Sequence, residues 1–465
     1  MNASQSKTAI RVFTEGNLTS QLVKFAIPVL LSHLMMVLLN TVDMIVVGYR
    51  LGEAGTSAVS IGGSVAMFLN AFIGGFASCV QVIIAMKIGS GKIKDISRLV
   101  ATVCGFISVA AVISMLVMLP LTDTMLRLLN TPVESYSGAF EYSRICLFGI
   151  IPIYFYHIIS AIFRGMGDSK HPLLFITLAC GLNIALDVVF VLGFDMGVGG
   201  AALATVLAQL VSVVFSFSLL VKRRKMYELS FSAKDFVKWD MRALGGFLRL
   251  GIPMALNNSA IQIANMVIGS LINDYGVSVS AFSGIRANIA TTVDLILGSL
   301  ATAGAMIIGQ NIAAGKLKRV NGTLLRVFII SACTSSVLIL LFLLFPIGAF
   351  RIFTDEQNVL DMVKPYLPIL IFSLVNAGVR PAIRALMDGS GNKKINIIVA
   401  LLDAILARIG LAALFCFTFE MGYMGLWLGI TVAELVPILI GVVFYFVSVR
   451  RKLQKQKSDL INEEK

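Results

Sequence analysis

Charged side chains are scarce in this sequence. Only 14% of its 465 residues are Asp, Glu, Lys or Arg, whereas 57% are hydrophobic and the mean hydropathy is +0.90. A soluble domain carries roughly 25% charged residues. This composition excludes an ordinary soluble protein.

The sequence also lacks the motifs of common catalytic and metal centres. It has three histidines, and its six cysteines show no metal-like spacing, so we expect neither zinc nor disulfides. There is no HExxH or GxSxG motif, and Gly91-Lys92 and Gly315-Lys316 lack the rest of a phosphate-binding loop. We therefore expect no enzyme and no cofactor.

What the sequence has instead is long apolar runs. A run of about 20 residues can cross a bilayer as a helix, because a helix satisfies its own backbone hydrogen bonds. The first 21 residues are polar, and the run that follows is too long for a cleavable signal peptide. Twelve spans are predicted, at 22–48, 57–85, 99–120, 138–163, 172–194, 198–221, 243–272, 279–310, 322–346, 362–386, 395–418 and 423–449.

The basic residues are distributed unequally between the two sides of these spans. The side that holds both termini carries 27 Lys and Arg, and the other side carries four. Such an excess is typical of cytoplasmic loops. We predict a multi-pass protein of the cell inner (cytoplasmic) membrane with both termini cytoplasmic. The net charge of +13 then faces anionic lipid headgroups, and no nucleic-acid partner is expected.

The two halves of the chain resemble each other at an offset of 224–225 residues. Ile27-Pro28 matches Ile252-Pro253, and the stretch 165–170 resembles 389–394. Each half holds six spans, so the halves share one orientation. The sequence predicts an all-α membrane protein of 12 transmembrane helices, in two six-helix lobes related by a pseudo-two-fold axis along the membrane normal. The predicted domains are the lobe 1–221, a cytoplasmic linker 222–242, the lobe 243–449 and a basic cytoplasmic tail 450–465.

Several polar side chains lie inside spans of the first half, where a buried charge is costly and is expected to face the bundle. These residues are Asn40, Asp43, Asn183, Asp187, Thr205 and Gln209. If they converge, two carboxylates with amide and hydroxyl oxygens around them can hold Na⁺ or a proton. The alternative is that they form hydrogen bonds between helices.

The second half does not keep these two acids, since Asp43 corresponds to a position near Ile268. Coupling to an ion is therefore expected in the first half. Candidate substrate-contacting residues are Asn40, His157 and Gln209 in the first half and Asn258, Gln262, Asn265, Asp294 and Asn376 in the second. Asp294 is equally consistent with a buried ion pair.

The sequence resembles the multidrug and toxic compound extrusion (MATE) family along nearly its whole length. The resemblance rests on Asn40 to Gly48, Gly89 to Lys92, Arg164 to Lys170, Asn183 to Asp187 and Gly199 to Thr205. It implies two six-helix lobes around a V-shaped central cavity. It also implies export of organic cations and other amphipathic compounds against inward Na⁺ or H⁺, with a cation site at Asp43, Asn183, Asp187 and Thr205.

These observations favour a secondary active efflux antiporter that works by alternating access, as a monomer among membrane lipids, on small-molecule substrates. The main alternative is a lipid-linked oligosaccharide flippase, which shares the broad fold. A flippase needs a cationic cavity for pyrophosphate, whereas the candidate cavity residues of the first half are acidic. A channel is a further alternative, but the broken symmetry between the two lobes argues for alternating access instead.

Overall fold

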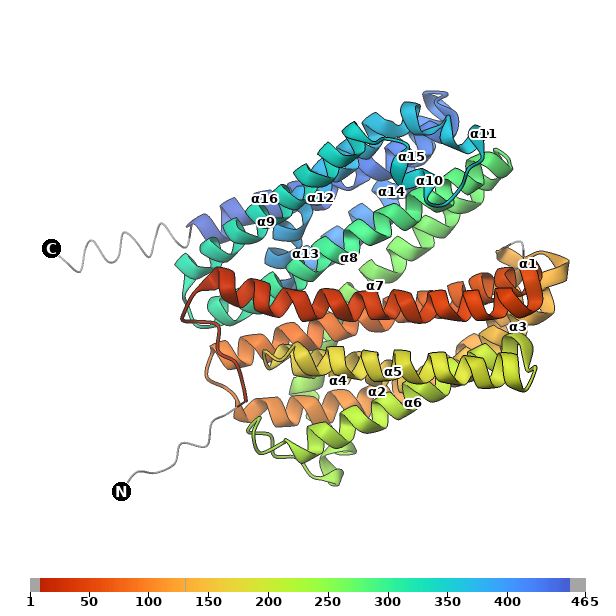
Figure 1. Ribbon diagram of the computed structural model, residues 1–465. Helices are drawn as coiled ribbons and strands as arrows, with labels where there is room; N and C mark the ends of the chain where they lie inside the picture. Colours follow the sequence, from red (N-terminus) through yellow and green to blue (C-terminus); the bar gives the residue numbers. More distant parts are fainter. Residues whose placement is uncertain (1–8, 130, 452–465) are drawn as a thin grey trace, which may run out of the picture. The chain divides into compact units, whose positions relative to one another are not determined.

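The computed structural model describes residues 9–129 and 131–451, and within these ranges the regular elements are all helices (Figure 1). The first half contains α1 (Leu18–Gly89), α2 (Lys94–Leu128), α3 (Val133–Phe148), α4 (Ile150–Gly165), α5 (Lys170–Asp187), the π-helical η1 (Val188–Gly193), α6 (Gly197–Lys222) and η2 (Ala233–Phe236). The second half contains α7 (Met241–Asn273), α8 (Val277–Ala313), α9 (Leu317–Leu344), α10 (Gly348–Arg351), α11 (Gln357–Leu360), α12 (Val363–Gly389), α13 (Lys393–Val399), η3 (Ala400–Ala407), α14 (Arg408–Ala413), η4 (Leu414–Thr418), α15 (Gly422–Ala433), α16 (Leu435–Phe444) and η5 (Tyr445–Arg450). Most of the predicted tail 450–465 lies outside the described residues.

Every predicted span falls on a helix. Within the described ranges, nine helices are long and apolar enough to cross a membrane, or ten when α3 and α4, bent by 53° at their junction, count as one span. The 72 residues of α1 contain two predicted spans, separated at Gly52, where φ is +64°. Together with the less apolar α7, these helices account for the twelve spans of an all-α, multi-pass membrane protein.

The backbone repeats as the sequence does. Among the described residues, ten of the twelve with positive φ form pairs at a separation of 224 or 225, and Gly16 and Glu228 have no such counterpart. A left-handed conformation is rare for residues other than glycine, yet Asp195 and Glu420 share it, with φ of 56° and 53°. The other pairs are Gly52 with Gly276, Gly91 with Gly315, Gly167 with Gly391 and Gly197 with Gly422. This correspondence supports the internal repeat independently of side-chain identity.

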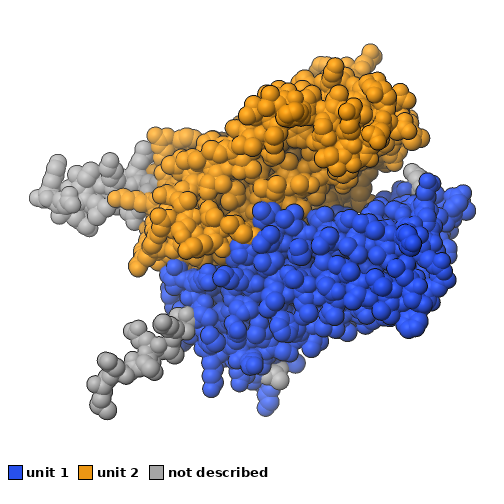
Figure 2. Space-filling model, viewed as in Figure 1, with its two compact units in different colours: residues 1–12, 28–255 blue, residues 13–27, 256–465 orange. Residues whose placement is uncertain are grey.

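The chain folds into two compact units, coloured separately in Figure 2. Unit 1 comprises the residues up to Val12 and 28–255, and unit 2 comprises 13–27 and 256 onward. The first turns of α1 therefore belong to unit 2, and α1 passes into unit 1 at Pro28. Likewise, the first half of α7 belongs to unit 1 as far as Ala255, just beyond Pro253. The lobe limits predicted from the repeat, 1–221 and 243–449, stay a prediction.

Hydrogen bonds explain why residues 13–27 belong to unit 2. The Phe13 N–H donates to Gln310 Oε1 at 2.7 Å, and its carbonyl accepts from Asn311 Nδ2 at 3.1 Å. The Arg319 guanidinium donates to the carbonyls of Phe13, Glu15 and Gly16. These bonds satisfy backbone groups that precede α1.

The connection 222–242 is folded against unit 1. Ser230 N donates to Ser97 Oγ at 2.9 Å, and Asp240 N donates to Thr102 Oγ1 at 3.1 Å, so the middle and the end of this connection contact α2. The side chain of Tyr227 is buried. The predicted linker is thus part of the packed structure of unit 1.

Candidate functional site

A buried carboxylate, Asp43, is the centre of a polar cluster within unit 1. It lies on the first part of α1 and is fully buried. Asn183 Nδ2 donates to its Oδ1 at 3.0 Å, whereas Tyr142 O–H and Thr205 O–H donate to its Oδ2 at 3.0 and 2.8 Å. Asn183 Nδ2 also donates to Thr205 Oγ1 at 3.2 Å. Four helices, α1, α3, α5 and α6, thus meet at one side chain.

The packing of these helices explains how residues far apart in sequence converge. In Figure 1, α5 and α6 run side by side, and α3 also contacts α6. Removing a charged group from water is costly unless hydrogen bonds replace its hydration. The three donors to Asp43 provide that replacement, so its carboxylate is stabilised by the fold itself.

Asp187 is the second carboxylate of the cluster, and its environment differs. It is the last residue of α5, next to the π-helical η1, and π turns in helices often mark functional sites. It is fully buried and interacts electrostatically with Asp43. Neither of its oxygens has a hydrogen-bond partner among the described residues, and Asn183 Oδ1 is equally unpartnered.

The available oxygens determine what this cluster can bind. Three buried oxygens without donors, beside a second carboxylate, fit a small hard cation such as Na⁺, which prefers oxygen ligands. A proton on one of the two carboxyl groups would also remove the repulsion between their negative charges. No group of three His, Cys, Asp or Glu side chains suited to a metal occurs in the described part of the chain.

All four residues predicted for a cation site are therefore in this cluster, but the other first-half candidates are not bonded to it. Asn40 is exposed on α1. Gln209 is buried on α6, and its Oε1 has no partner in the described chain. The His157 ring packs edge-on against Tyr156 with centroids 5.4 Å apart.

The second-half candidates occupy unit 2 and do not form one cluster. Asn376 donates to the carbonyl of Thr431 at 2.9 Å, a hydrogen bond between α12 and α15. Asp294 pairs with Arg380. On α7, Asn258 and Gln262 are half-buried and Asn265 is exposed.

Sequence reasoning missed Tyr142. Tyrosines are common in transmembrane segments, especially near membrane interfaces, so a phenol in a predicted span gave no specific signal. Its role depends on the tertiary packing that brings α3 to Asp43 of α1.

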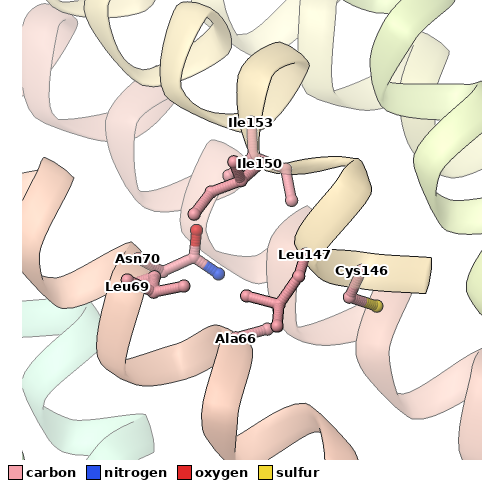
Figure 3. Close-up of a pocket in the computed structure, with 7 residues that line it drawn as sticks. All are labelled: Ala66, Leu69, Asn70, Cys146, Leu147, Ile150 and Ile153. Atoms are coloured by element: carbon pink, nitrogen blue, oxygen red, sulfur yellow. The ribbon is translucent and has the colours of Figure 1, made fainter. Parts of the chain in front are cut away.

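A small cavity lies one turn beyond Tyr142, at the bend between α3 and α4 (Figure 3). Cys146 and Ile150 line it from the two sides of the bend, and Asn70 of α1 is its one polar lining residue. The α3–α4 bend therefore leaves space close to the polar cluster.

Comparison with known proteins identifies the family. The MatE family model matches residues 28–189 and 253–414, which together exceed half of the chain. The two matches begin at Pro28 and Pro253, a separation of 225 that agrees with the internal repeat. Each half of the chain thus carries one copy of the family unit.

Curated relatives match over most of their length. A protein named probable multidrug resistance protein YpnP, from Bacillus subtilis, is 28% identical, with 90% of this chain and 92% of the relative covered. The probable multidrug resistance protein NorM of Thermotoga maritima is 25% identical, with 88% of each covered. The multidrug export protein MepA of Staphylococcus aureus is 22% identical, with 97% of this chain and 98% of the relative covered.

Solved structures share the fold. A MOP superfamily transporter from Pyrococcus furiosus superimposes with a TM-score of 0.86 at 23% identity, covering 97% of this chain and 99% of that one. A crystal structure of MATE in the bent conformation gives a TM-score of 0.86 at 24% identity, with 95% and 98% covered. The likeness in sequence and in fold extends over almost the whole chain, which belongs to the MatE family.

Proposed function

We propose that this protein is a secondary active multidrug efflux antiporter that exports organic cations or amphipathic compounds in exchange for Na⁺ or H⁺. The observation that carries the proposal is the contrast between the two buried carboxylates of unit 1. Asp43 accepts three hydrogen bonds, whereas Asp187 accepts none from the described residues. A buried, unpartnered carboxylate requires a cation or a proton to be stable.

The same contrast gives a basis for coupling. Two carboxylates in a dry environment repel each other, and a bound Na⁺ or proton removes this repulsion. An ion can shift a conformational equilibrium only if it binds the two conformations with different affinity. Because the site joins four helices, a small relative movement of α5 and α6 would change the distances between the oxygens and hence the affinity for the ion.

The names of the relatives support the substrate class. YpnP, NorM and MepA are all named for multidrug resistance or export. We propose small-molecule substrates for this chain too, transported by a monomer in the cytoplasmic membrane with both termini cytoplasmic. The orientation rests on the 27 to 4 distribution of basic residues.

Transport by the purified protein in liposomes tests the proposal. An imposed Na⁺ or pH gradient should drive ethidium movement in vesicles with the natural chain, and Asp187→Asn should abolish it. Asp355→Asn, the same substitution at an exposed loop position, is the matched control and should transport normally. Gradient-driven transport that persists in folded Asp187→Asn protein would refute the antiport assignment.

The identity of the ion can be tested on the same cluster. If Na⁺ and H⁺ compete for these carboxylates, Na⁺ should promote release of the drug, and acidic pH should weaken Na⁺ binding. Thr205→Val removes an oxygen but no titrating group, so it should impair Na⁺ binding more than proton-driven transport. Na⁺ affinity that stays constant from about pH 5 to 8 would contradict a shared site.

A further inference from the structure

Unit 2 contains an ion cluster that the coupling site does not use. The Arg380 guanidinium, on α12, pairs with Asp294 of α8 through one nitrogen and with Glu434, at the end of α15, through the other. The Arg380 Nη1 to Glu434 Oε1 distance is 2.8 Å. One arginine therefore bridges two carboxylates within the membrane-spanning part of the chain.

The cluster has an excess of negative charge. Glu434 also interacts electrostatically with Arg408 and Asp403, which form their own ion pair at 3.3 Å. Arg286 of α8 interacts with Tyr366 and is eight residues from Asp294, or about 12 Å along the helix. Among the groups that interact directly with Arg380 or Glu434, three carboxylates thus face two guanidinium groups. Glu434 is buried, and its Oε2 has no hydrogen-bond partner in the described chain.

The two carboxylates bonded to Arg380 differ in accessibility. The Asp294 side chain is 54% exposed and that of Glu434 is 11% exposed. A half-exposed carboxylate in a membrane span cannot face lipid without a large energetic cost. Asp294 must therefore face a polar space.

The rest of this helix face supports the same conclusion. Apart from Val277 at the start of α8, its other exposed residues are small or polar, namely Ala281, Gly284, Ala287, Asn288, Thr291 and Thr292. By contrast, α9 exposes Leu325, Ile329 and Leu340, as expected of a face in contact with lipid. The α8 face that carries Asp294 is thus suited to water and solutes.

We propose that Asp294 is a recognition site for a monovalent organic cation, and that Arg380 is the internal counter-ion that this ligand displaces. An ammonium, pyridinium or phenanthridinium group would pair with the accessible carboxylate of Asp294. Arg380 would then turn fully to Glu434 and bind both of its oxygens, including the unpartnered Oε2. The inference rests on the proposed export function and names the residue that would hold the substrate.

This exchange explains why the cluster contains an arginine. Without a ligand, Arg380 keeps Asp294 neutralised, so an isolated charge is not left in the span. With a cationic ligand, the guanidinium regains its lost contact at Glu434, in the planar two-point geometry that arginine favours. Arg380 thereby competes with the ligand and limits its affinity, which suits a transporter that must release its substrate.

Binding to the purified full-length protein in detergent, without any gradient, tests this inference. Ethidium serves as the cationic probe and N-phenyl-1-naphthylamine as an uncharged one, both followed by fluorescence. Asp294→Asn should weaken ethidium binding at least tenfold and change binding of the uncharged probe less than twofold. Asp274→Asn, at an exposed turn of unit 2, is the matched control and should bind both probes normally.

A second variant tests the role of Arg380. Replacing it alone would leave a buried acid unpaired, which is strongly destabilising. The double variant Arg380→Gln/Glu434→Gln removes both members and leaves Asp294 free, so ethidium should bind at least threefold more tightly than to the natural chain. Ethidium binding that is absent from the natural chain, unchanged in Asp294→Asn, or not tightened in the double variant would overturn the inference.

The outcome of this binding test can be distinguished from the outcome of the transport test on the coupling site. If Asp294→Asn weakens ethidium binding as expected but Asp187→Asn leaves transport unchanged, antiport is refuted and cation recognition is not. If Asp187→Asn abolishes transport but Asp294→Asn leaves ethidium binding unchanged, only the recognition site is refuted.

Discussion

The Tyr142 hydroxyl donates a hydrogen bond of 3.0 Å to Asp43 Oδ2, across 99 residues of sequence. Thr205 donates to the same oxygen at 2.8 Å. Asp43 Oδ2 therefore has two donors, and Oδ1 has one, from Asn183. This unequal distribution allows the contributions of the donors to be separated by mutation.

Tyr142→Phe should have a moderate effect. It removes one donor from Asp43 Oδ2 but leaves the hydrogen bond from Thr205, so we expect a loss of about 1 kcal/mol in the free energy of unfolding. Ion-driven transport should fall several-fold without being abolished. Thermal unfolding in detergent and transport in liposomes measure the two effects. Complete loss of transport in a stable Tyr142→Phe protein would mean that the phenol has a more direct role than supporting Asp43.

Asp43→Asn and Asp187→Asn should differ in stability although both should abolish ion-driven transport. Asparagine at position 43 would direct an N–H₂ group toward existing donors, at a cost of about 1–3 kcal/mol. Asparagine at position 187 removes an unpartnered buried charge, so the stability should be unchanged or increased. Thermal melting of the two variants against the natural protein checks this difference.

The reverse order of stability would contradict the environments described for the two acids. Asn183→Ala provides a further comparison, because it removes the one donor to Asp43 Oδ1 and should destabilise the protein as Asp43→Asn does.

Asp168, in the loop that precedes α5, should make the stability of the folded protein depend on pH. Burial alone would raise the pKa of Asp168, but hydrogen bonds from His171 and Tyr227 outweigh it and lower the pKa to about 2. A carboxyl whose pKa is lowered on folding stabilises the folded state above its unfolded pKa, near 3.9. About 2 kcal/mol of stability should therefore be lost as the pH falls from about 4 to 2.

Asp168→Asn should remove this pH dependence and still fold. Asn392, its counterpart 224 residues later, accepts a hydrogen bond from Lys394 N as Asp168 does from Lys170 N. Asp240→Asn is the matched control, because Asp240 caps α7 with hydrogen bonds from Arg242 N and Ala243 N. Unfolding in detergent from pH 6 to 2.5 should show the lost dependence only for the substitution at position 168.

Cysteine labelling should distinguish the polar face of α8 from the lipid face of α9. Cys333 is exposed and the other five cysteines are buried, so Cys333→Ser gives a suitable background. In that background, Thr291→Cys should react with a membrane-impermeant methanethiosulfonate reagent in vesicles, and Ile329→Cys should not. Equal labelling of both positions would mean that the exposed face of α8 does not line a water-accessible space.

Much of the fold could be predicted from the sequence, because membrane insertion depends on local composition. Runs of apolar residues must be helical where the backbone has no water to bond. The predicted spans therefore fall on helices, including the two that α1 joins. The repeat was equally visible, since Pro28 and Pro253 lie at equivalent positions, and the backbone at Asp195 and Glu420 confirms it.

The candidate ion site was predictable only in part. Asp43 and Asp187 could be identified one at a time, because a carboxylate in a membrane span is costly wherever it lies. Tyr142 could not be identified, since its role depends on the packing that brings α3 to Asp43 of α1. In the same way, the sequence did not distinguish a structural Asp294 from a functional one. Its pairing with Arg380 and its exposure depend on the packing of α8, α12 and α15.

The sequence by itself determined which segments are apolar and long enough to cross a membrane and how the two halves correspond. These properties follow from free energies of transfer, which are largely additive over neighbouring residues. The tertiary structure alone decided which polar groups share a site, how many donors each carboxylate receives, and that residues 13–27 belong with the second unit. The physical reason is that hydrogen bonds and ion pairs between helices act over about 3 Å. They therefore depend on how the helices pack, which the hydrophobicity of each segment does not determine.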